Sequence, residues 1–330
     1  MRTLQTKTSQ CFFLACAVLV CVLALSVSRA LAGPQKAPDR VKAIMIGDRI
    51  VDIAYNLGVV PAAMSVRCSK WPMCKQLNNA VQVLGCPKCV LKKKAGPILD
   101  AAREKDINRI IVEKHPEFCK YMDISPLELV PFIEDQGFDI EYVDFSKGLE
   151  SAVQQTAELL DRKSKGTSLI NEYNMKMERT KEKIKDLDRS RKVLIINGIY
   201  QRKTGRVMLQ VEAPGGYADQ FLLDPLECEN VGGAFQVGDK EPAKGHYRVP
   251  KSRKGLVLDS LVDANPDIIV MTGNAFAIQK AISSARKYTK GLDRVSAIQN
   301  NRLYALPGYI DASVIEYPMI LRMWADAMDG

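Results

Sequence analysis

Strand-type and helix-type segments alternate along this chain, and the alternation occurs twice. In the first half, short apolar runs occupy residues 42–47, 62–66, 109–114 and 139–144. Segments with helical spacing of apolar residues separate these runs, at residues 48–58, 95–106 and 125–137. Strands separated by helices predict a parallel sheet that is covered by helices on both faces.

The same alternation returns in the second half of the chain. Strand-type runs occupy residues 192–198, 267–273 and 302–308, and helix-type segments occupy residues 260–266 and 275–285. A chain of this length is long enough for two separate hydrophobic cores. We therefore expect two α/β lobes, at residues 41–147 and 192–330.

Residues 148–191 connect the two predicted lobes. Within them Leu169, Tyr173, Met177 and Ile184 recur at helical spacing, and Glu alternates with Lys at the other positions. The pattern predicts one long helix between the lobes. A coiled coil is the alternative, but the periodic stretch is too short for several heptads. A helical connector resists large hinge motions, so two rigid lobes with a cleft between them indicate binding.

The N-terminal segment, residues 1–32, has the features of a secretory signal peptide. Arg2 and Lys7 precede an apolar run at residues 11–25, and the small residues Ala30-Leu31-Ala32 follow. The run is shorter than the roughly 20 residues that span a bilayer, which argues against a membrane anchor. We expect cleavage near Ala32 and a periplasmic protein that is not embedded in the membrane.

Charge and cysteine content restrict the functional classes. The formal net charge of +9 stays positive when residues 1–32 are removed, which favours an anionic ligand. Basic runs interleaved with aromatic residues are missing from the sequence, which argues against nucleic acid as a partner. Six of the nine cysteines follow residue 32. An even number of cysteines in an exported chain favours disulfides.

Several local patterns, in a fixed order, resemble one family. They are "RIVDIAYNLGVVP", "CSKWPMCKQL", "GGYADQFLLDPLECENVGG" and "VLDSLVDANPDIIVMTG". Together they resemble the class III periplasmic substrate-binding proteins of ABC importers for siderophores, haem and cobalamin, over residues 41–327. Two departures accompany the resemblance: residues 97–114 lack the family's Lys-Pro-Asp, and the cysteine-rich segment 68–89 is not typical of it.

The resemblance implies an α/β fold with two Rossmann-like three-layer lobes, one long α-helix between them and a ligand cleft between the lobes. It implies a monomeric periplasmic protein that binds a metal chelate, namely a corrinoid, haem or a ferric siderophore. This protein would deliver its ligand to a membrane permease. By position in the matching helices, Glu128 and Asp259 would contact that permease. Catalysis is not implied, because no motif in the sequence specifies a reaction.

Ligands of doubly wound sheets lie at the carboxyl ends of the strands, so the residues after each strand are candidates. Aromatic rings there would stack on a ligand, and cationic side chains would bind its carboxylates. The candidates, some placed by the resemblance, are Arg67, Trp71, Lys114, His115, Tyr200, Arg206, Tyr247 and Arg248. The alternatives are core packing for the aromatic residues and simple solvation for the charged ones.

The histidines and four of the cysteines are candidate metal ligands: His115, His246, Cys68, Cys74, Cys86 and Cys89. Imidazole and thiolate both suit transition metals. The cysteine spacing departs from that of a zinc ribbon, and disulfides are the preferred interpretation in an oxidising compartment. No resident cofactor is expected, since a metal would arrive within the transported chelate. The alternative function is a periplasmic protein that binds a metal ion directly through these side chains. A third is an exported enzyme, such as a metal-chelating or redox protein that uses Cys86 and Cys89, but a thioredoxin-like βαβ context is missing before this motif.

Overall fold

The structure is a computed structural model that describes residues 37–68, 71, 73–115, 125–187, 190–201, 203–253, 255–309 and 314–330. The predicted signal peptide, residues 1–32, lies outside the described residues. Arg40–Gly330 form one compact unit. Within the described part of the chain, no helix combines the length and apolarity needed to cross a bilayer.

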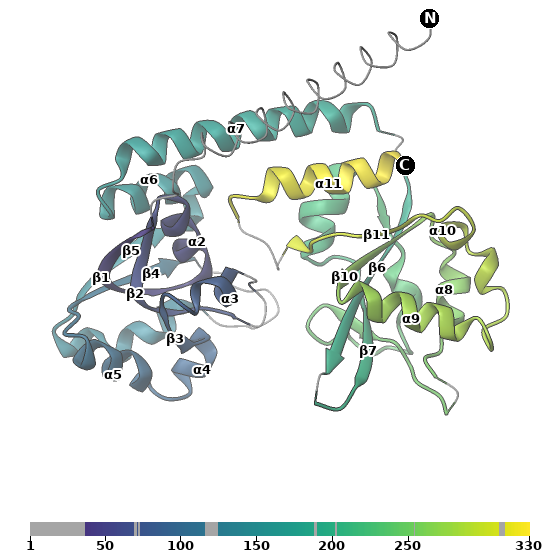
Figure 1. The fold of residues 1–330 in the computed structure, drawn as a ribbon, viewed down its shortest axis with the longest axis horizontal. Helices are drawn as coiled ribbons and strands as arrows, with labels where there is room; N and C mark the ends of the chain where they lie inside the picture. The colour runs from purple at the N-terminus through teal and green to yellow at the C-terminus, as the bar shows by residue number, and fades with distance from the viewer. Residues whose placement is uncertain are drawn as a thin grey trace, which may run out of the picture. The chain divides into compact units, whose positions relative to one another are not determined.

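A five-stranded sheet forms the centre of the first lobe (Figure 1). Its strands are β1 (Asp39–Ile46), β2 (Val59–Ser65), β3 (Gln82–Gly85), β4 (Arg109–Lys114) and β5 (Asp139–Asp144). They lie in the order β3-β2-β1-β4-β5, and the pairs β1–β4, β2–β3 and β4–β5 are parallel. The parallel sheet predicted for this half is confirmed, although the short strand β3 was not expected.

Helices cover both faces of this sheet, and the sequence of β1 shows why. Ala43 and Met45 point into one hydrophobic cluster, whereas Ile44 and Ile46 point into the other, because side chains alternate along a strand. The first cluster packs against α2 (Asp48–Asn56) and the second against α5 (Gly96–Glu104). Two short helices, α3 (Met73–Leu77) and α4 (Pro87–Leu91), flank β3.

The helix predicted at residues 125–137 is a pair of 3₁₀ segments, η1 (Pro126–Phe132) and η2 (Glu134–Gln136). Pro131 lies inside η1 and has no N–H to donate, which disfavours a continuous α-helix. Ser125 caps η1: its Oγ accepts from Leu127 N at 3.3 Å, while Glu128 Oε1 accepts from Ser125 N at 2.8 Å. A further 3₁₀ turn, η3 (Phe145–Lys147), follows β5.

Two helices occupy the connector, α6 (Leu149–Leu159) and α7 (Lys163–Lys185). The long helix α7, teal in Figure 1, carries ion pairs along its surface, such as Glu172 with Lys176 at 2.6 Å. Gly166 allows α6 to approach closely, because a Cβ there would lie 2.6 Å from Ala157 Cβ. The long connecting helix is therefore present.

A six-stranded sheet forms the centre of the second lobe. Its strands are β6 (Lys192–Gln201), β7 (Arg206–Glu212), β8 (Glu229–Asn230), β9 (His246–Arg248), β10 (Ile268–Gly273) and β11 (Leu303–Ala305). The main order is β11-β10-β6-β7-β9, and β8 pairs with β6. β10 is parallel to β6 and β11, but β7 is antiparallel to both β6 and β9. This sheet is therefore mixed, whereas the sheet of the first lobe is parallel.

The mixed pairing has a local cause in the chain after Gly198. β6 does not end there but continues to Gln201, where a tight turn begins with Gly205 N donating to Gln201 O at 2.8 Å. The turn returns the chain as β7, and antiparallel strands need only such a short connection. Residues 199–201 and Arg206, which were expected in a loop after a strand, therefore belong to the strands β6 and β7.

Helices again cover both sheet faces. α8 (Asp259–Ala264) and α9 (Ala275–Ala285) pack on the face that holds Leu194 and Ile196, and α11 (Tyr317–Asp329) packs on the face of Val193 and Ile195. The remaining short elements are η4 (Asp219–Leu223), η5 (Asp224–Leu226), η6 (Val231–Phe235), η7 (Leu292–Arg294) and α10 (Ser296–Gln299). The structure thus has two three-layer α/β lobes with a long helix between them in the chain, as predicted.

Candidate functional site

The strand order of the first lobe creates a topological switch point between β1 and β4. The chain leaves β1 toward β2 on one side, whereas β4 lies on the other side. Ligands of open α/β sheets bind at such a point, beyond the carboxyl ends of the strands. Asp48 and Arg49 follow β1, Arg67 follows β2, and Glu113 lies near the end of β4. These four charged residues form the switch-point cluster.

Arg49 and Glu113 form a buried ion pair in this cluster. The Glu113 side chain has no exposed area, and its carboxylate accepts from Arg49 Nε at 2.5 Å and from Arg49 N at 3.1 Å. Burial raises the pKa of the Glu113 carboxyl, and the positive charge of Arg49 opposes that rise. The Arg49 guanidinium also lies over the Phe145 ring, 4.3 Å from its centroid. The orientation of Arg49 is therefore fixed from two sides.

Gly47 permits this close approach between β1 and β4. Its φ of 131° is unfavourable for residues with a side chain, and a Cβ would lie 2.4 Å from both Cβ and Oε2 of Glu113. Only glycine leaves room for the carboxylate to reach Arg49. The backbone conformation at Gly47 and the Arg49–Glu113 ion pair therefore depend on each other.

Arg67, a predicted ligand contact, is held by Asp48 in the same cluster. Arg67 N donates to Asp48 Oδ1 at 2.7 Å, and Arg67 Nε forms an ion pair with Asp48 Oδ2. Both side chains are largely buried. The structure therefore places Arg67 at the switch point, with one carboxylate already bound to it.

The prediction missed Asp48, Arg49 and Glu113. Two signals were present in the sequence: Asp48 and Arg49 directly follow the first strand-type run, and Glu113 is an acid inside an apolar strand. The rule that selected Arg67 would also have selected the residues after the first strand.

Four aromatic side chains gather in the second lobe, and these were missed as well. Phe221 stacks on Tyr309 with ring centroids 3.9 Å apart, while Tyr317 meets Tyr309 edge to face at 5.6 Å and Tyr217 lies 6.3 Å from it. Burial raises the pKa of Tyr309 to about 12, against the opposing positive charges of Arg49 and Arg67. The cluster offers flat apolar contact area and neutral phenols.

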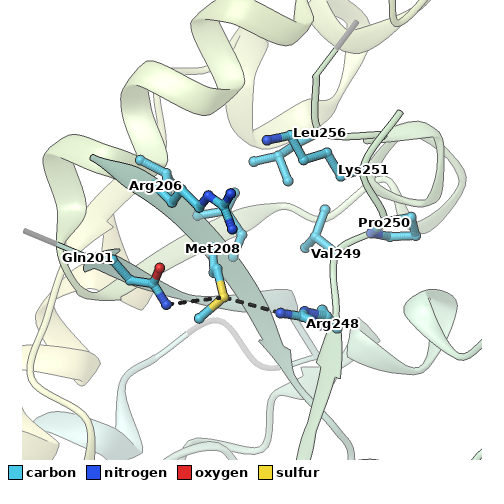
Figure 2. A pocket seen from close by; sticks show the side chains of 10 residues that line it. Gln201, Arg206, Met208, Arg248, Val249, Pro250, Lys251 and Leu256 are labelled. Atoms are coloured by element: carbon cyan, nitrogen blue, oxygen red, sulfur yellow. Dashed lines mark hydrogen bonds between the residues drawn. The ribbon is translucent and has the colours of Figure 1, made fainter. Parts of the chain in front are cut away.

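A pocket of about 500 Å³ opens on the hairpin of the second lobe (Figure 2). Arg206 on β7, Arg248 on β9 and Lys251 line it together with Gln201 and Met208. Arg248 Nη2 donates to Met208 Sδ at 3.2 Å. Two of the predicted ligand-binding arginines, distant in sequence, are thus brought to one pocket, which we call the hairpin pocket. It concentrates positive charge around an open volume.

The two tyrosines predicted beside these arginines do not line the hairpin pocket. Tyr200 pairs with Val207 in the β6–β7 ladder and is 47% exposed, and Tyr247 OH lies 3.4 Å from Gln236 Oε1. Successive residues of a strand point to opposite faces, so Tyr247 cannot share the face of Arg248. Both lie on strands and not on the loops expected from the sequence.

The Trp71 side chain is buried. It is only 3% exposed and belongs to the first-lobe core that also contains Cys74. A disulfide joins Cys68 to Cys74, and Trp71 N donates to Arg67 O at 2.9 Å, so the segment is folded back on the lobe. The structure thus shows core packing for Trp71, and contact with a ligand stays a prediction. The thiols of Cys68 and Cys74 are consumed by the disulfide and are not metal ligands in this state.

Lys114 and His115 lie at the carboxyl end of β4, as predicted. Lys114 is exposed, 3.9 Å from Asp144, and lines a pocket of about 340 Å³ on the surface of η1. The carbonyl of His115 accepts from Ser125 Oγ at 3.2 Å, and its side chain is partly buried. The residues that follow His115, up to residue 124, lie outside the described part of the chain.

His246, a candidate metal ligand from the sequence, is buried. It lies on β9 and is 8% exposed; its Nδ1 is 2.9 Å from Lys244 O and its Nε2 is 3.3 Å from Glu212 Oε1. Both ring nitrogens therefore face protein oxygens, which leaves neither directed at a ligand. Among the described residues, no three or more His, Cys, Asp or Glu are arranged to hold a metal ion.

The remaining predicted residues lie on the surface. Cys86 and Cys89 are free thiols with their sulfurs 2.9 Å apart. Glu128 is exposed on η1, where its carboxylate also serves the cap of Ser125, and Asp259 is exposed at the first position of α8. Each acid therefore lies in its own lobe, at the start of a helical segment.

The comparisons with known proteins concern the fold. No protein-family model matches the sequence, and no curated protein matches it. Among solved structures, a solute-binding protein from Veillonella parvula is 13% identical, with a TM-score of 0.57 over 89% of this chain and 82% of that one. The haem-binding protein BhuT, solved with two haems, is 14% identical with a TM-score of 0.56. The match covers 88% of this chain and 98% of BhuT. RhuT from Roseiflexus, also a haem-binding protein, is 14% identical with a TM-score of 0.55. The match covers 88% of this chain and 98% of RhuT. The chain has the two-lobed fold of these periplasmic binding proteins.

Proposed function

We propose that this chain is a periplasmic binding protein that carries an anionic metal chelate to the permease of an ABC import system. The observation that carries the proposal is the hairpin pocket, where Arg206, Arg248 and Lys251 surround about 500 Å³. Clefts of this size suit small ligands, and guanidinium groups bind carboxylates through paired hydrogen bonds. Haem and ferric siderophores carry such acidic groups, and corrinoids remain in the candidate set.

The switch-point cluster and the aromatic cluster support the same ligand class. Arg49 and Arg67 add guanidinium donors in the first lobe, each also paired with a carboxylate, and Tyr309 and Phe221 add flat rings in the second. A planar chelate with acidic substituents needs both kinds of contact. The fold that the chain shares with haem-binding BhuT and RhuT agrees with this ligand class.

The alternative function, direct binding of a metal ion by cysteine and histidine, has less support. Its six candidate ligands include two joined in a disulfide and a histidine whose nitrogens face Lys244 O and Glu212. A metal ion needs several donors that converge on one point. We therefore retain the chelate as the proposed ligand.

Charge removal in the hairpin pocket tests the proposal. Arg206→Ala and Arg248→Ala should each weaken binding of an anionic chelate about tenfold, since a hydrogen bond to a charged group contributes about 1.5–3 kcal/mol. Haemin, a ferric siderophore and cobalamin are the ligands to titrate, with fluorescence quenching or calorimetry as the readout. Arg294→Ala, an exposed arginine of η7, is the matched control. Equal affinities for all three variants and the unchanged protein would exclude the hairpin pocket as the ligand site.

We propose further that Glu128 and Asp259 dock the protein on its permease. Both carboxylates are exposed, one on each lobe, and can meet cationic side chains of a partner. Glu128→Gln keeps a carbonyl oxygen for the Ser125 N–H and removes only the charge. Together with Asp259→Asn it should reduce uptake several-fold and leave chelate affinity unchanged. Glu134→Gln, an exposed acid of η2, is the control, and an undiminished uptake in the double variant would remove both residues from the interface.

A further inference from the structure

Cys86 and Cys89 lie at the carboxyl end of β3, outside the sites discussed above. Gly85 ends that strand and accepts from Val66 N at 3.0 Å, so the pair is anchored beside β2. The two sulfurs are 2.9 Å apart, and Cys89 N donates to Cys86 Sγ at 3.4 Å. Cys86 is partly buried and Cys89 is exposed.

We propose that Cys86 and Cys89 form a reversible dithiol–disulfide site that exchanges with small anionic thiols and disulfides of the glutathione type. The inference does not rest on the transport function. Two thiols separated by two residues can close a local disulfide, and the sulfurs already point at each other. The same chain carries the Cys68–Cys74 disulfide, so disulfide chemistry is available to it.

Exposure distinguishes the two cysteine pairs. Cys74 is fully buried in the first-lobe core and Cys68 is partly buried against it, so neither sulfur of that bond is as exposed as Cys89. Cys89 is open to solvent, and exposed disulfides are the exchangeable ones. We therefore assign a structural role to the first pair and exchange to the second.

Charge around the pair favours an anionic reagent. Lys88 lies between the cysteines, and Lys92, Lys93 and Lys94 follow them; all four are exposed. No acidic residue occurs from residue 82 to residue 99. Glutathione is an anion at neutral pH, so this local positive field attracts it.

The order of attack follows from the surroundings of each sulfur. Burial raises the pKa of the Cys86 thiol, and the hydrogen bond with Cys89 adds to this rise. Cys89, the exposed sulfur, therefore meets the incoming disulfide first. Cys86 then resolves the adduct, because it is already in contact with Cys89.

The reaction balances as two exchange steps. The Cys89 thiolate attacks a disulfide R–S–S–R, forms the mixed disulfide Cys89–S–S–R and releases one thiolate. The Cys86 thiolate then attacks Cys89 Sγ, forms the Cys86–Cys89 bond and releases the second thiolate. Two electrons pass from the protein dithiol to R–S–S–R, and the two protein thiol protons end on two R–SH molecules.

A bound metal is a weaker interpretation of the same pair. Among the described residues, no third His, Cys, Asp or Glu joins the two sulfurs to form a metal-binding group. Structural zinc sites use four protein ligands, so two thiolates alone leave the coordination incomplete. Disulfide exchange requires only the two sulfurs that are present.

The test is equilibration of the purified mature chain in buffers of reduced and oxidised glutathione, followed by alkylation and peptide mass spectrometry. The Cys86–Cys89 peptide should convert fully between dithiol and disulfide across the series, while Cys68–Cys74 stays oxidised. In Cys86→Ser the adduct cannot be resolved, so Cys89 should accumulate bound glutathione. Cys89→Ser should form about tenfold less adduct at Cys86 in the same time, because that thiol is partly buried.

Three outcomes would overturn the proposal. They are a Cys86–Cys89 pair that remains dithiol in oxidised glutathione, equal adduct formation in the two single variants, and a stoichiometric metal ion retained by the pair. Cys228→Ser is the control for unrelated thiol chemistry, since burial raises the pKa of Cys228 to about 11. Affinity for a chelate is measured separately, so failure here leaves the transport proposal untouched.

Discussion

Arg49 and Glu113 show how a single ion pair organises the switch point. The carboxylate has lost all contact with solvent, and its burial is tolerated because Arg49 donates to it from both side chain and backbone. Removing one partner of such a pair leaves an uncompensated buried charge, which costs more than the pair itself contributes. The free energy of unfolding should therefore respond strongly, and in a pH-dependent way, to loss of Arg49.

Arg49→Met should lower the free energy of unfolding by about 3 kcal/mol at pH 7. The folded-state pKa of the Glu113 carboxyl is raised, so this group contributes to the stability of the folded protein at pH values below its unfolded-state pKa. That contribution is lost as the pH rises through the folded-state pKa. Loss of Arg49 raises that folded pKa further, so the destabilisation should grow as the pH rises above about 4.5. Urea unfolding at several pH values measures this.

The control for Arg49→Met is Arg286→Met, which breaks an exposed ion pair with Asp293. Exposed pairs contribute about 1 kcal/mol or less, so this variant should stay close to the unchanged protein at every pH. A destabilisation by Arg49→Met that is equally small, or that shrinks as the pH rises, would contradict the assignment of a buried pair.

Gly47→Ala tests the steric part of the same site. The added Cβ would meet Glu113 at 2.4 Å in a backbone conformation suited to glycine, so we expect a loss of about 2–4 kcal/mol in the free energy of unfolding. Gly137→Ala is the matched control: its φ is also positive, but nothing lies within 4 Å, and about 1 kcal/mol is expected. Similar losses in the two variants would show that crowding at Glu113 contributes nothing.

At the scale of elements, the Cys68–Cys74 disulfide closes a short loop after β2. Cys68→Ala combined with Cys74→Ala should lower the free energy of unfolding by about 2 kcal/mol, the chain-entropy estimate for so small a loop. Denaturant unfolding with and without a reductant measures the effect. Reduction should bring the unchanged protein to the level of the double variant, and a difference that persists under reduction would refute the entropic account.

Most strands and helices were predictable because their period was visible in the sequence. β4, β5 and α9 begin and end at the predicted residues, since each is a continuous apolar or amphipathic run. η1 was not predicted as 3₁₀, because the capping box of Ser125 resembles the start of an α-helix and Pro131 acts only later in the segment. The strand β7 was missed because the hairpin turn before it has an ordinary composition. The strand β9 was missed because a polar loop precedes it.

At the scale of the whole molecule, the site was predicted only where it followed from a strand end. Arg67 was found by that rule, and Arg206 and Arg248 reach one pocket through the antiparallel pairing of β7 with β9. The aromatic cluster was invisible, because Tyr217, Phe221, Tyr309 and Tyr317 come from separate segments that only tertiary packing brings together. The burial of Trp71 could not be predicted, because a buried ring and a ligand-stacking ring have the same local sequence.

The most direct measurement is native mass spectrometry, with an absorption spectrum, of the protein purified from its own source. We expect one coloured, non-covalent chelate per chain, whose loss lowers the melting temperature because a ligand of the folded state stabilises it. A bare metal ion in place of the chelate would contradict the proposed function. So would an empty protein whose melting temperature stays constant when haemin, a ferric siderophore or cobalamin is added.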